Sequence, residues 1–198
     1  MLSTLGCAPL DGDSTVVEVA SDGATAARAH AAVEDLAHVQ LSSGGVLVEQ
    51  PLLNATLEDE TVHIHPHVNL GIAVALDEGL TVPVIPQAES LRLADLSIAI
   101  QDTAKKARSN QLPPAAYGGG TFTITNLGQF GIDSFDPIIN PPQVAILGVG
   151  RIQDRVVAVN GAPTVRPMMT LTVTFDHRAT DGAPASQFLS KVKELLEN

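Results

Sequence analysis

The sequence predicts an α/β fold, a two-layer sandwich in which helices cover a mixed β-sheet. Short runs rich in apolar and β-branched residues, which are typical of strands, intermix along the chain with longer segments of helical periodicity. Such intermixing favours helices packed on a sheet over an all-helical or all-strand architecture. The 198 residues carry no internal repeat or low-complexity linker, and we expect a single domain over residues 1–198.

The composition supports a packed core of mainly aliphatic side chains. Hydrophobic residues make up 44% of the chain and charged residues 17%, as in globular proteins, whereas aromatic residues make up only 3%. A chain of this length buries roughly 70% of its unfolded surface on folding. The core must therefore be filled by aliphatic side chains rather than by rings.

The N-terminal half is expected to hold three strands and one helix. Residues 1–13 have the composition of a flexible leader. The predicted strands cover residues 15–19, 61–64 and 70–76. Asp77-Glu78-Gly79 predicts a turn after the third strand. Helical periodicity predicts a helix over 24–39, Gly44-Gly45 should break the chain after it, and residues 46–57 are ambiguous between helix and strand.

The C-terminal half is expected to hold four strands and two helices. An apolar stripe at helical spacing predicts a helix over 93–109, which Pro113-Pro114 should end. The predicted strands cover residues 121–125, 144–151, 154–159 and 168–175. The middle two are expected to flank a turn, and Asn160-Gly161 is a further turn signal. An amphipathic pattern predicts a final helix over 183–196.

Charge and cysteine content exclude several classes of protein. A net charge of −11 argues against nucleic acid or anionic membrane as the main partner. The chain has no charge-free apolar run long enough to span a membrane, and its first residues lack the pattern of a secretory signal. Cys7 is the single cysteine and cannot form an internal disulfide, so we expect a cytoplasmic protein.

One motif carries the residues of acid–base chemistry. Asp176-His177-Arg178-Ala179-Thr180-Asp181-Gly182 lies between the last predicted strand and the final helix. Neutral imidazole accepts a proton near pH 7, and a neighbouring carboxylate can hold its tautomer, so His177 is a candidate general base. The alternative is a surface turn whose charged residues form ordinary ion pairs. The local residues alone leave both interpretations open.

Other reactive side chains give weaker signals. His63, His65 and His67 alternate, so a strand would place them on one face, and three histidines can bind zinc. Pro66 interrupts the segment, and no cysteine or carboxylate completes a metal motif, so we expect no metal. Cys7 has no histidine near it in sequence and is not expected to be a nucleophile.

A basic cluster and several longer motifs remain. Lys105, Lys106 and Arg108 form the only tight basic cluster, which is either a solvated helix face or a phosphate-binding patch. The longer motifs are residues 51–55, 68–74, 79–85, 119–128 and 137–148. Together with the His177 motif, and in the same order, they resemble the catalytic domain of the dihydrolipoamide acyltransferases. These are the core components of 2-oxo acid dehydrogenase complexes and relatives of chloramphenicol acetyltransferase. The resemblance extends from about residue 51 to residue 198 and implies a chloramphenicol acetyltransferase-like fold.

The resemblance implies transfer of an acyl group from S-acyl-dihydrolipoamide to the thiol of coenzyme A. It assigns His177 as the general base that deprotonates the thiol, and Thr125 as the hydroxyl donor to the tetrahedral oxyanion. Asp181 is given a supporting role, while Asp176 and Arg178 are expected to be architectural. Judged by propensity alone, Thr125 is an ordinary strand residue. Coenzyme A is a substrate, no metal is expected, and the coenzyme-binding residues stay unassigned.

The resemblance also implies partners. The family's active site lies between subunits, so we expect a homotrimer rather than a larger shell. A larger shell uses a C-terminal helix that does not follow Leu195-Leu196 here. Neither a lipoyl domain nor a subunit-binding domain is expected within the chain. The lipoyl group should therefore come from another domain or chain, within a complex that includes the dehydrogenase components.

Two alternatives and the acyl group stay open. The acceptor could be the phosphopantetheine of a carrier protein in a biosynthetic pathway, or the chain could be a non-catalytic core scaffold. The presence of His177, Thr125 and Asp181 speaks against a scaffold. The sequence does not distinguish acetyl, succinyl, branched or hydroxyacyl groups.

Overall fold

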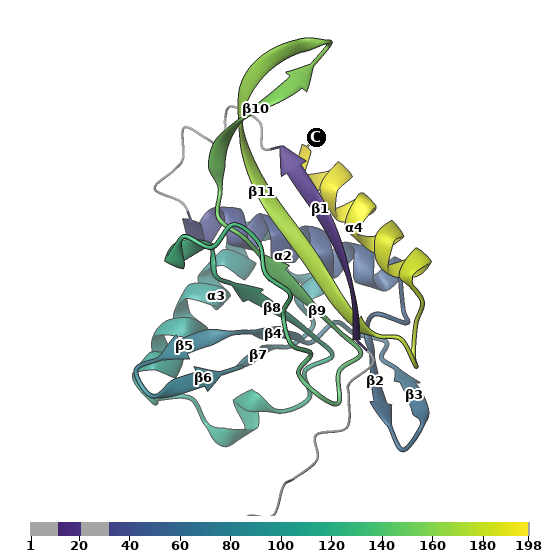
Figure 1. The fold of residues 1–198 in the computed structure, drawn as a ribbon. Coiled ribbons are helices and arrows are strands. Elements are labelled where there is room, and N and C mark those ends of the chain that lie inside the picture. Colours follow the sequence, from purple (N-terminus) through teal and green to yellow (C-terminus); the bar gives the residue numbers. More distant parts are fainter. Residues whose placement is uncertain (1–11, 21–31, 198) are drawn as a thin grey trace, which may run out of the picture.

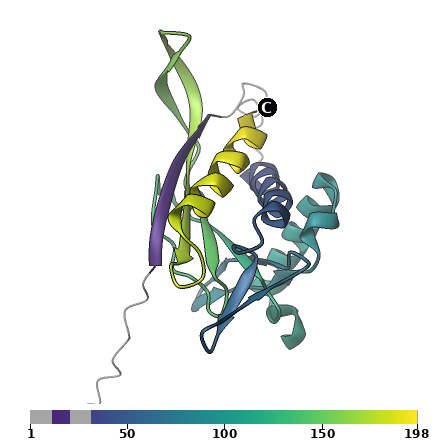
Figure 2. The same ribbon diagram turned by 90° about the vertical axis from the view of Figure 1, so that its right-hand side faces the viewer.

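The computed structural model describes residues 12–20 and 32–197. Its centre is a seven-stranded mixed sheet, and three helices lie against one face of it (Figures 1 and 2). The helices are α2 (Ala32–Glu49), α3 (Leu93–Arg108) and α4 (Gly182–Glu197). The predicted two-layer α/β class is confirmed, and none of the helices in these ranges is long and apolar enough to cross a membrane.

The strand order explains why the sheet is mixed. The sheet runs in the order β1-β11-β9-β8-β4-β7, and β10 also pairs with β11. These strands are β1 (Gly12–Ala20), β4 (Leu70–Ile72), β7 (Val84–Ile85), β8 (Phe122–Asn126), β9 (Ala145–Val149), β10 (Gln153–Val159) and β11 (Ala162–Asp176). Strand β8 is parallel to both β4 and β9, and the other neighbours are antiparallel.

Smaller elements surround the sheet. Two hairpins stand outside it, formed by β2 (Ala55–Glu58) with β3 (Thr61–Ile64) and by β5 (Val74–Leu76) with β6 (Gly79–Thr81). Three single turns of 3-10 helix are η1 (Ala88–Ser90), η2 (Pro114–Tyr117) and η3 (Gly128–Phe130). The predicted strand over 70–76 is therefore divided between the main sheet and a hairpin.

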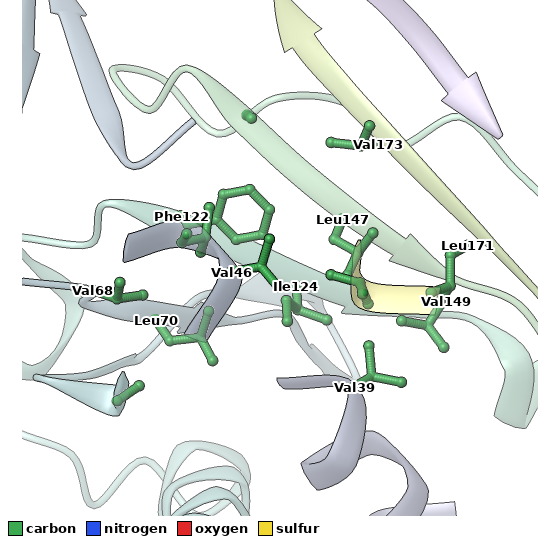
Figure 3. Close-up of a cluster of buried hydrophobic side chains, with 14 of the residues drawn as sticks. Val39, Val46, Val68, Leu70, Phe122, Ile124, Leu147, Val149, Leu171 and Val173 are labelled. Carbon is green, nitrogen blue, oxygen red and sulfur yellow. The ribbon is translucent and has the colours of Figure 1, made fainter. Parts of the chain in front are cut away.

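The core lies between the sheet and the helices, and the alternation of the strands builds it. Phe122 and Ile124 of β8 point to the helix side, as do Leu171, Val173 and Phe175 of β11, and all five are almost completely buried. Aliphatic side chains from α2 and β9 fill the space between them (Figure 3). Each fully buried side chain of this kind contributes about 1.5–3 kcal/mol. The described core is mainly aliphatic, as the composition predicts.

Helix α2 departs from the prediction. It continues through Gly44 and Gly45, which were expected to break the chain, and ends only at Glu49. Val46 and Leu47 are buried just after the two glycines. Their burial outweighs the cost of about 1 kcal/mol for each glycine within a helix. Residues 24–31 of the predicted helix lie outside the described residues.

Strands β9 and β10 do not flank a turn, which corrects a second prediction. Both lie along the same side of the long strand β11, where Val149 is opposite Leu171 and Gln153 is opposite Met168. One extra residue between them forms a β-bulge at 150–152. The chain reverses at Asn160-Gly161, whose φ angles of 51° and 80° suit a two-residue hairpin turn. The far end of this hairpin projects from the body of the protein (Figure 1).

Strand β1 begins earlier than predicted. Gly12 and Asp13, assigned above to a leader, belong to this strand and pair with Asp176 and Phe175. The remaining leader residues, including Cys7, lie outside the described residues. Strand β1 thereby reaches the end of β11, where the His177 motif begins.

Candidate active site

The turn that carries His177 is fixed to the sheet at the end of β11. The backbone N–H of Asp176 donates to Val144 O over 2.8 Å, and Phe175 just before it is fully buried. The His177 ring lies against Phe175, with 5.9 Å between ring centroids, and its side chain is half exposed. The turn is therefore held in place while the imidazole stays accessible. A general base that acts on an incoming substrate requires both.

Asp176 and Arg178 form the strongest polar contact of this turn. Arg178 donates from Nε and Nη2 to the two carboxylate oxygens of Asp176, at 2.9 and 2.6 Å, and its backbone N–H donates to Oδ1 at 3.0 Å. The hydrogen bonds from the Arg178 side chain are the main reason why the pKa of Asp176 lies below its usual value. This geometry fits the architectural role expected for the pair.

Asp181 contacts His177 only loosely. Its Oδ1 lies 3.6 Å from Nδ1 of His177, which is beyond hydrogen-bond length, and its side chain is 80% exposed. Water therefore competes for both partners. The structure brings the two predicted residues together but does not lock the imidazole through this carboxylate.

Thr125 lies on β8, on the face of the sheet that the helices leave uncovered. Phe122 and Ile124 point into the core, so Thr121, Thr123 and Thr125 project to the opposite face. The first two hydroxyls hydrogen-bond to side chains, whereas that of Thr125 has no hydrogen bond among the described residues. Its half-buried hydroxyl is therefore available to a ligand.

Thr125 and His177 do not meet within one chain. Thr125 pairs with Gly148, and Gly148 pairs with Thr172 of β11, whereas His177 lies five residues later in the chain, just after β11 ends at Asp176. At about 3.3 Å per residue this separates the two side chains by on the order of 15 Å along the strands alone. One chain therefore cannot present both groups to a single carbonyl carbon.

Loop 127–143, which follows Thr125, is tied to the bulge at 150–152. Arg151 donates its backbone N–H to Ile132 O over 2.8 Å and forms an ion pair with Asp133. A Cβ on Gly150 would overlap the carbonyl oxygen of Asp133. A glycine is needed there because the loop backbone crosses so close to the bulge.

The three alternating histidines separate into different environments. His63 is exposed on β3, His65 Nε2 lies 3.0 Å from the hydroxyl of Thr56, and His67 Nδ1 lies 2.9 Å from Glu89. Burial raises the pKa of Glu89, but hydrogen bonds from His67 and from backbone amides outweigh it, so the net pKa lies below the usual value. Within 12–20 and 32–197, no three His, Cys, Asp or Glu side chains gather as a metal site.

The basic cluster lies at the end of α3, in its last turn. Lys106 pairs with Asp102, and all three cations complement the negative end of the helix dipole. Helix α3 packs near the separate strand β5 and near β7, an edge strand of the main sheet, whereas β11 lies next to the other edge strand, β1. All three side chains are exposed in the single chain and lie away from that chain's own His177.

A buried polar network was not predicted. Thr121 donates to Asn54 Oδ1 over 2.6 Å, and the amide of Asn54 donates to the carbonyls of His65 and His67. Asn69 joins this network through its backbone N–H to the Thr121 hydroxyl. Both asparagines fall within motifs that carried the family resemblance, which is the one sequence signal that could have identified them. The network fixes Thr121, just before β8, the strand that carries Thr125.

Comparisons with known proteins agree on one family. The family described as "2-oxoacid dehydrogenases acyltransferase (catalytic domain)" matches residues 22–198. The acetyltransferase component of the acetoin cleaving system of Bacillus subtilis is 48% identical over 160 residues. A mouse mitochondrial succinyltransferase component of the 2-oxoglutarate dehydrogenase complex is 45% identical over 159 residues. Each match covers 79% of this chain but only 40% and 35% of those relatives, so the chain spans less than half of their length.

Solved structures share the fold. The dihydrolipoamide acetyltransferase of Azotobacter vinelandii has a TM-score of 0.88 and 30% identity, covering 96% of this chain and 82% of that one. Work on that protein concerned a serine, a histidine and an asparagine in its catalytic mechanism, spaced along its chain as Thr125, His177 and Asp181 are here. A chloramphenicol acetyltransferase, 17% identical, has a TM-score of 0.58 and covers 94% of this chain and 88% of its own, which shows a common fold.

Proposed function

The chain belongs to the family of 2-oxoacid dehydrogenase acyltransferases, through their catalytic domain, and we propose on that basis that it transfers an acyl group from S-acyl-dihydrolipoamide to coenzyme A. The observation that carries the proposal is His177, an accessible imidazole on a rigid turn at the family's spacing from Thr125. Both relatives are named as dihydrolipoyllysine-residue acyltransferases, which favours coenzyme A chemistry over a carrier-protein acceptor or a scaffold.

The reaction exchanges one thioester for another, and the proton taken from one sulfur is given to the other. His177 takes the proton from the coenzyme A thiol, and the resulting thiolate forms a bond to the thioester carbonyl carbon. The carbonyl electron pair moves to oxygen, and the Thr125 hydroxyl donates a hydrogen bond to that oxyanion. When the tetrahedral intermediate collapses, the bond to the dihydrolipoamide sulfur breaks, and that sulfur receives the proton from His177. No covalent enzyme intermediate is required.

A complete site requires a second copy of the chain, because one chain holds Thr125 and His177 far apart. We propose a homotrimer in which Thr125 of one subunit faces His177 of the next. Three exposed apolar side chains on the loop after Thr125, namely Phe130, Ile132 and Ile138, support this arrangement. Such a surface is expected to be covered by another protein surface, and the second copy is the one that the incomplete site requires.

The lipoyl group and the acyl group are the remaining parts of the proposal. The lipoyl arm would come from another domain or chain of a dehydrogenase complex, and coenzyme A would enter as a substrate. The two relatives carry acetyl and succinyl in their names, so these two acyl groups are the first to test.

The test compares transfer from S-acetyl- and S-succinyl-dihydrolipoamide to coenzyme A by the wild type and by His177→Ala. Loss of a general base should lower kcat by about 10²–10⁴-fold. His63→Ala, at an exposed histidine on β3, is the matched control and should keep the wild-type rate. An unchanged rate in His177→Ala would remove the proposed mechanism. A folded trimeric wild type that transfers neither acyl group would remove the proposed function.

A further inference from the structure

A general base must be held in one orientation, and Asp181 is poorly placed to hold the His177 imidazole. The contact between Nδ1 and the Asp181 carboxylate spans 3.6 Å, which is beyond hydrogen-bond length, and within a single chain the carboxylate is largely exposed. Exposed ion pairs contribute a median of about 0–1 kcal/mol. Such a contact cannot hold an imidazole against the motion of an exposed turn.

Asp176, one residue before the histidine, has the opposite character. Its side chain is only 12% exposed. Its carbonyl oxygen accepts the backbone N–H groups of Ala179 and Thr180, at 3.0 and 3.2 Å, and its carboxylate accepts that of Arg178. Bonds from residue 176 to residues 178, 179 and 180 therefore close around residue 177 and restrict its backbone dihedral angles.

The side chain of Arg178, which follows the histidine, adds further bonds to Asp176, which precedes it. Its guanidinium holds both oxygens of the Asp176 carboxylate, a charge-assisted two-point contact that resists rotation. Since Asp176 is also bonded to Val144 and paired with Gly12 of β1, the turn is anchored to two neighbouring strands.

We infer that the Asp176–Arg178 pair, and not Asp181, is the element that positions the His177 imidazole for proton transfer. The inference rests on the proposed function, in which His177 is the general base. Asp176 and Arg178 are positioning residues, since they act through the backbone of the turn. A displacement of about 1 Å at a catalytic group can cost about 10²-fold in rate, so loosening this turn should lower kcat.

The experiment measures kcat and KM for coenzyme A in Asp176→Asn, Arg178→Gln, Arg178→Lys and Asp181→Ala. We expect Asp176→Asn and Arg178→Gln each to lower kcat by about 10–100-fold, with KM changed by less than about threefold. Arg178→Lys keeps the charge but loses the two-point contact, and should recover part of the kcat that Arg178→Gln loses. Asp181→Ala, which removes the side-chain acceptor, should cost less than about fivefold.

A second arginine–aspartate pair serves as the control. It separates the effect of positioning His177 from the general effect of removing a charge. Arg92 and Asp95 form a similar two-point contact at the start of α3, away from His177. Arg92→Gln and Asp95→Asn should leave kcat unchanged. If Asp176 and Arg178 act as one unit, the double variant Asp176→Asn/Arg178→Gln should lose no more activity than the worse single variant.

Three results would overturn the inference. One is a larger kcat loss in Asp181→Ala than in Asp176→Asn, and another is full additivity in the double variant. The third is a kcat loss that merely follows the folded fraction measured by circular dichroism. Arg178 is largely exposed, so its variants keep the test valid if Asp176→Asn does not fold. Failure of the proposed function is recognised separately, because the folded wild type would then transfer neither acyl group.

Discussion

At the scale of single residues, the motif around His177 contains two kinds of residue. Some hold the turn in place, and others remain accessible at the surface. Asp176 and Arg178 face each other and bind tightly, while His177 and Asp181 remain accessible at the surface. A candidate base needs access to its substrate, so it cannot itself carry the bonds that hold it. The hydrogen bonds that hold the turn are formed by Asp176 and Arg178, the residues before and after His177.

The pKa of Asp176 makes a prediction about stability against pH. The pKa is lower in the folded state, mainly because of the Arg178 side chain, so the folded state binds fewer protons than the unfolded state in the acid range. The stabilisation is therefore complete above the unfolded value of about 4 and is lost as the pH falls through the lower folded value. The wild type should be more stable than Asp176→Asn above pH 4, and the difference should shrink below it.

Urea unfolding of both proteins between pH 3 and 7, at one protein concentration, measures this difference. A gap in the free energy of unfolding that stays constant down to pH 3 would show that the charge of Asp176 is not what stabilises the turn.

At the scale of elements, the bulge between β9 and β10 links the sheet to the loop after Thr125. Gly150 lets the backbone at Asp133 pass, and Arg151 binds that loop by a backbone hydrogen bond and an ion pair. A bulge is a common means of redirecting a strand and its side chains near a functional site. Here it provides the fixed point against which the loop is packed.

Two glycine substitutions test this role. Gly150→Ala should lower the free energy of unfolding by about 1–3 kcal/mol or more, because its Cβ overlaps a backbone carbonyl that cannot move freely. Gly45→Ala is the control: Gly45 is exposed within α2, with no atom within 4 Å of an added Cβ, and should raise stability by about 1 kcal/mol. Denaturant unfolding measures both, and a neutral Gly150→Ala would show that the loop crosses the bulge less closely.

At the scale of the whole molecule, the sheet separates the two groups that the proposed reaction requires at one site. Thr125 lies on β8 and His177 follows β11, two strands that are separated by β9 and run in opposite directions. The loop beside Thr125 exposes Phe130 and Ile138. The proposed homotrimer would account for both features, since each subunit would supply a histidine to one neighbour and a hydroxyl to the other.

Mixed trimers test this arrangement directly. Thr125→Ala and His177→Ala should each be nearly inactive, yet trimers reassembled from an equal mixture should recover about a quarter of the wild-type sites, those that join an intact histidine to an intact threonine. Activity is measured after joint refolding and compared with a mixture of the separately refolded variants. No recovery in verified mixed trimers would place both groups of one site on one chain.

The sequence by itself determined the type of most elements and the chemistry-bearing turn. Period-two and helical patterns predicted β3, α3, β8 and α4 to within a few residues, because such patterns report which face of an element is buried. The His177 motif was visible because its residues are close together in sequence, and because its contacts, Asp176 with Arg178 and His177 with Asp181, are local.

Tertiary structure decided what local patterns do not contain. The continuation of α2 through Gly44 and Gly45 depends on burial against other elements, and the alignment of β9 with β10 depends on the partner strand β11. The distance between Thr125 and His177 likewise follows from strand register, which joins residues far apart in the chain. Periodicity reports which side of an element is buried, whereas only packing decides what it is buried against.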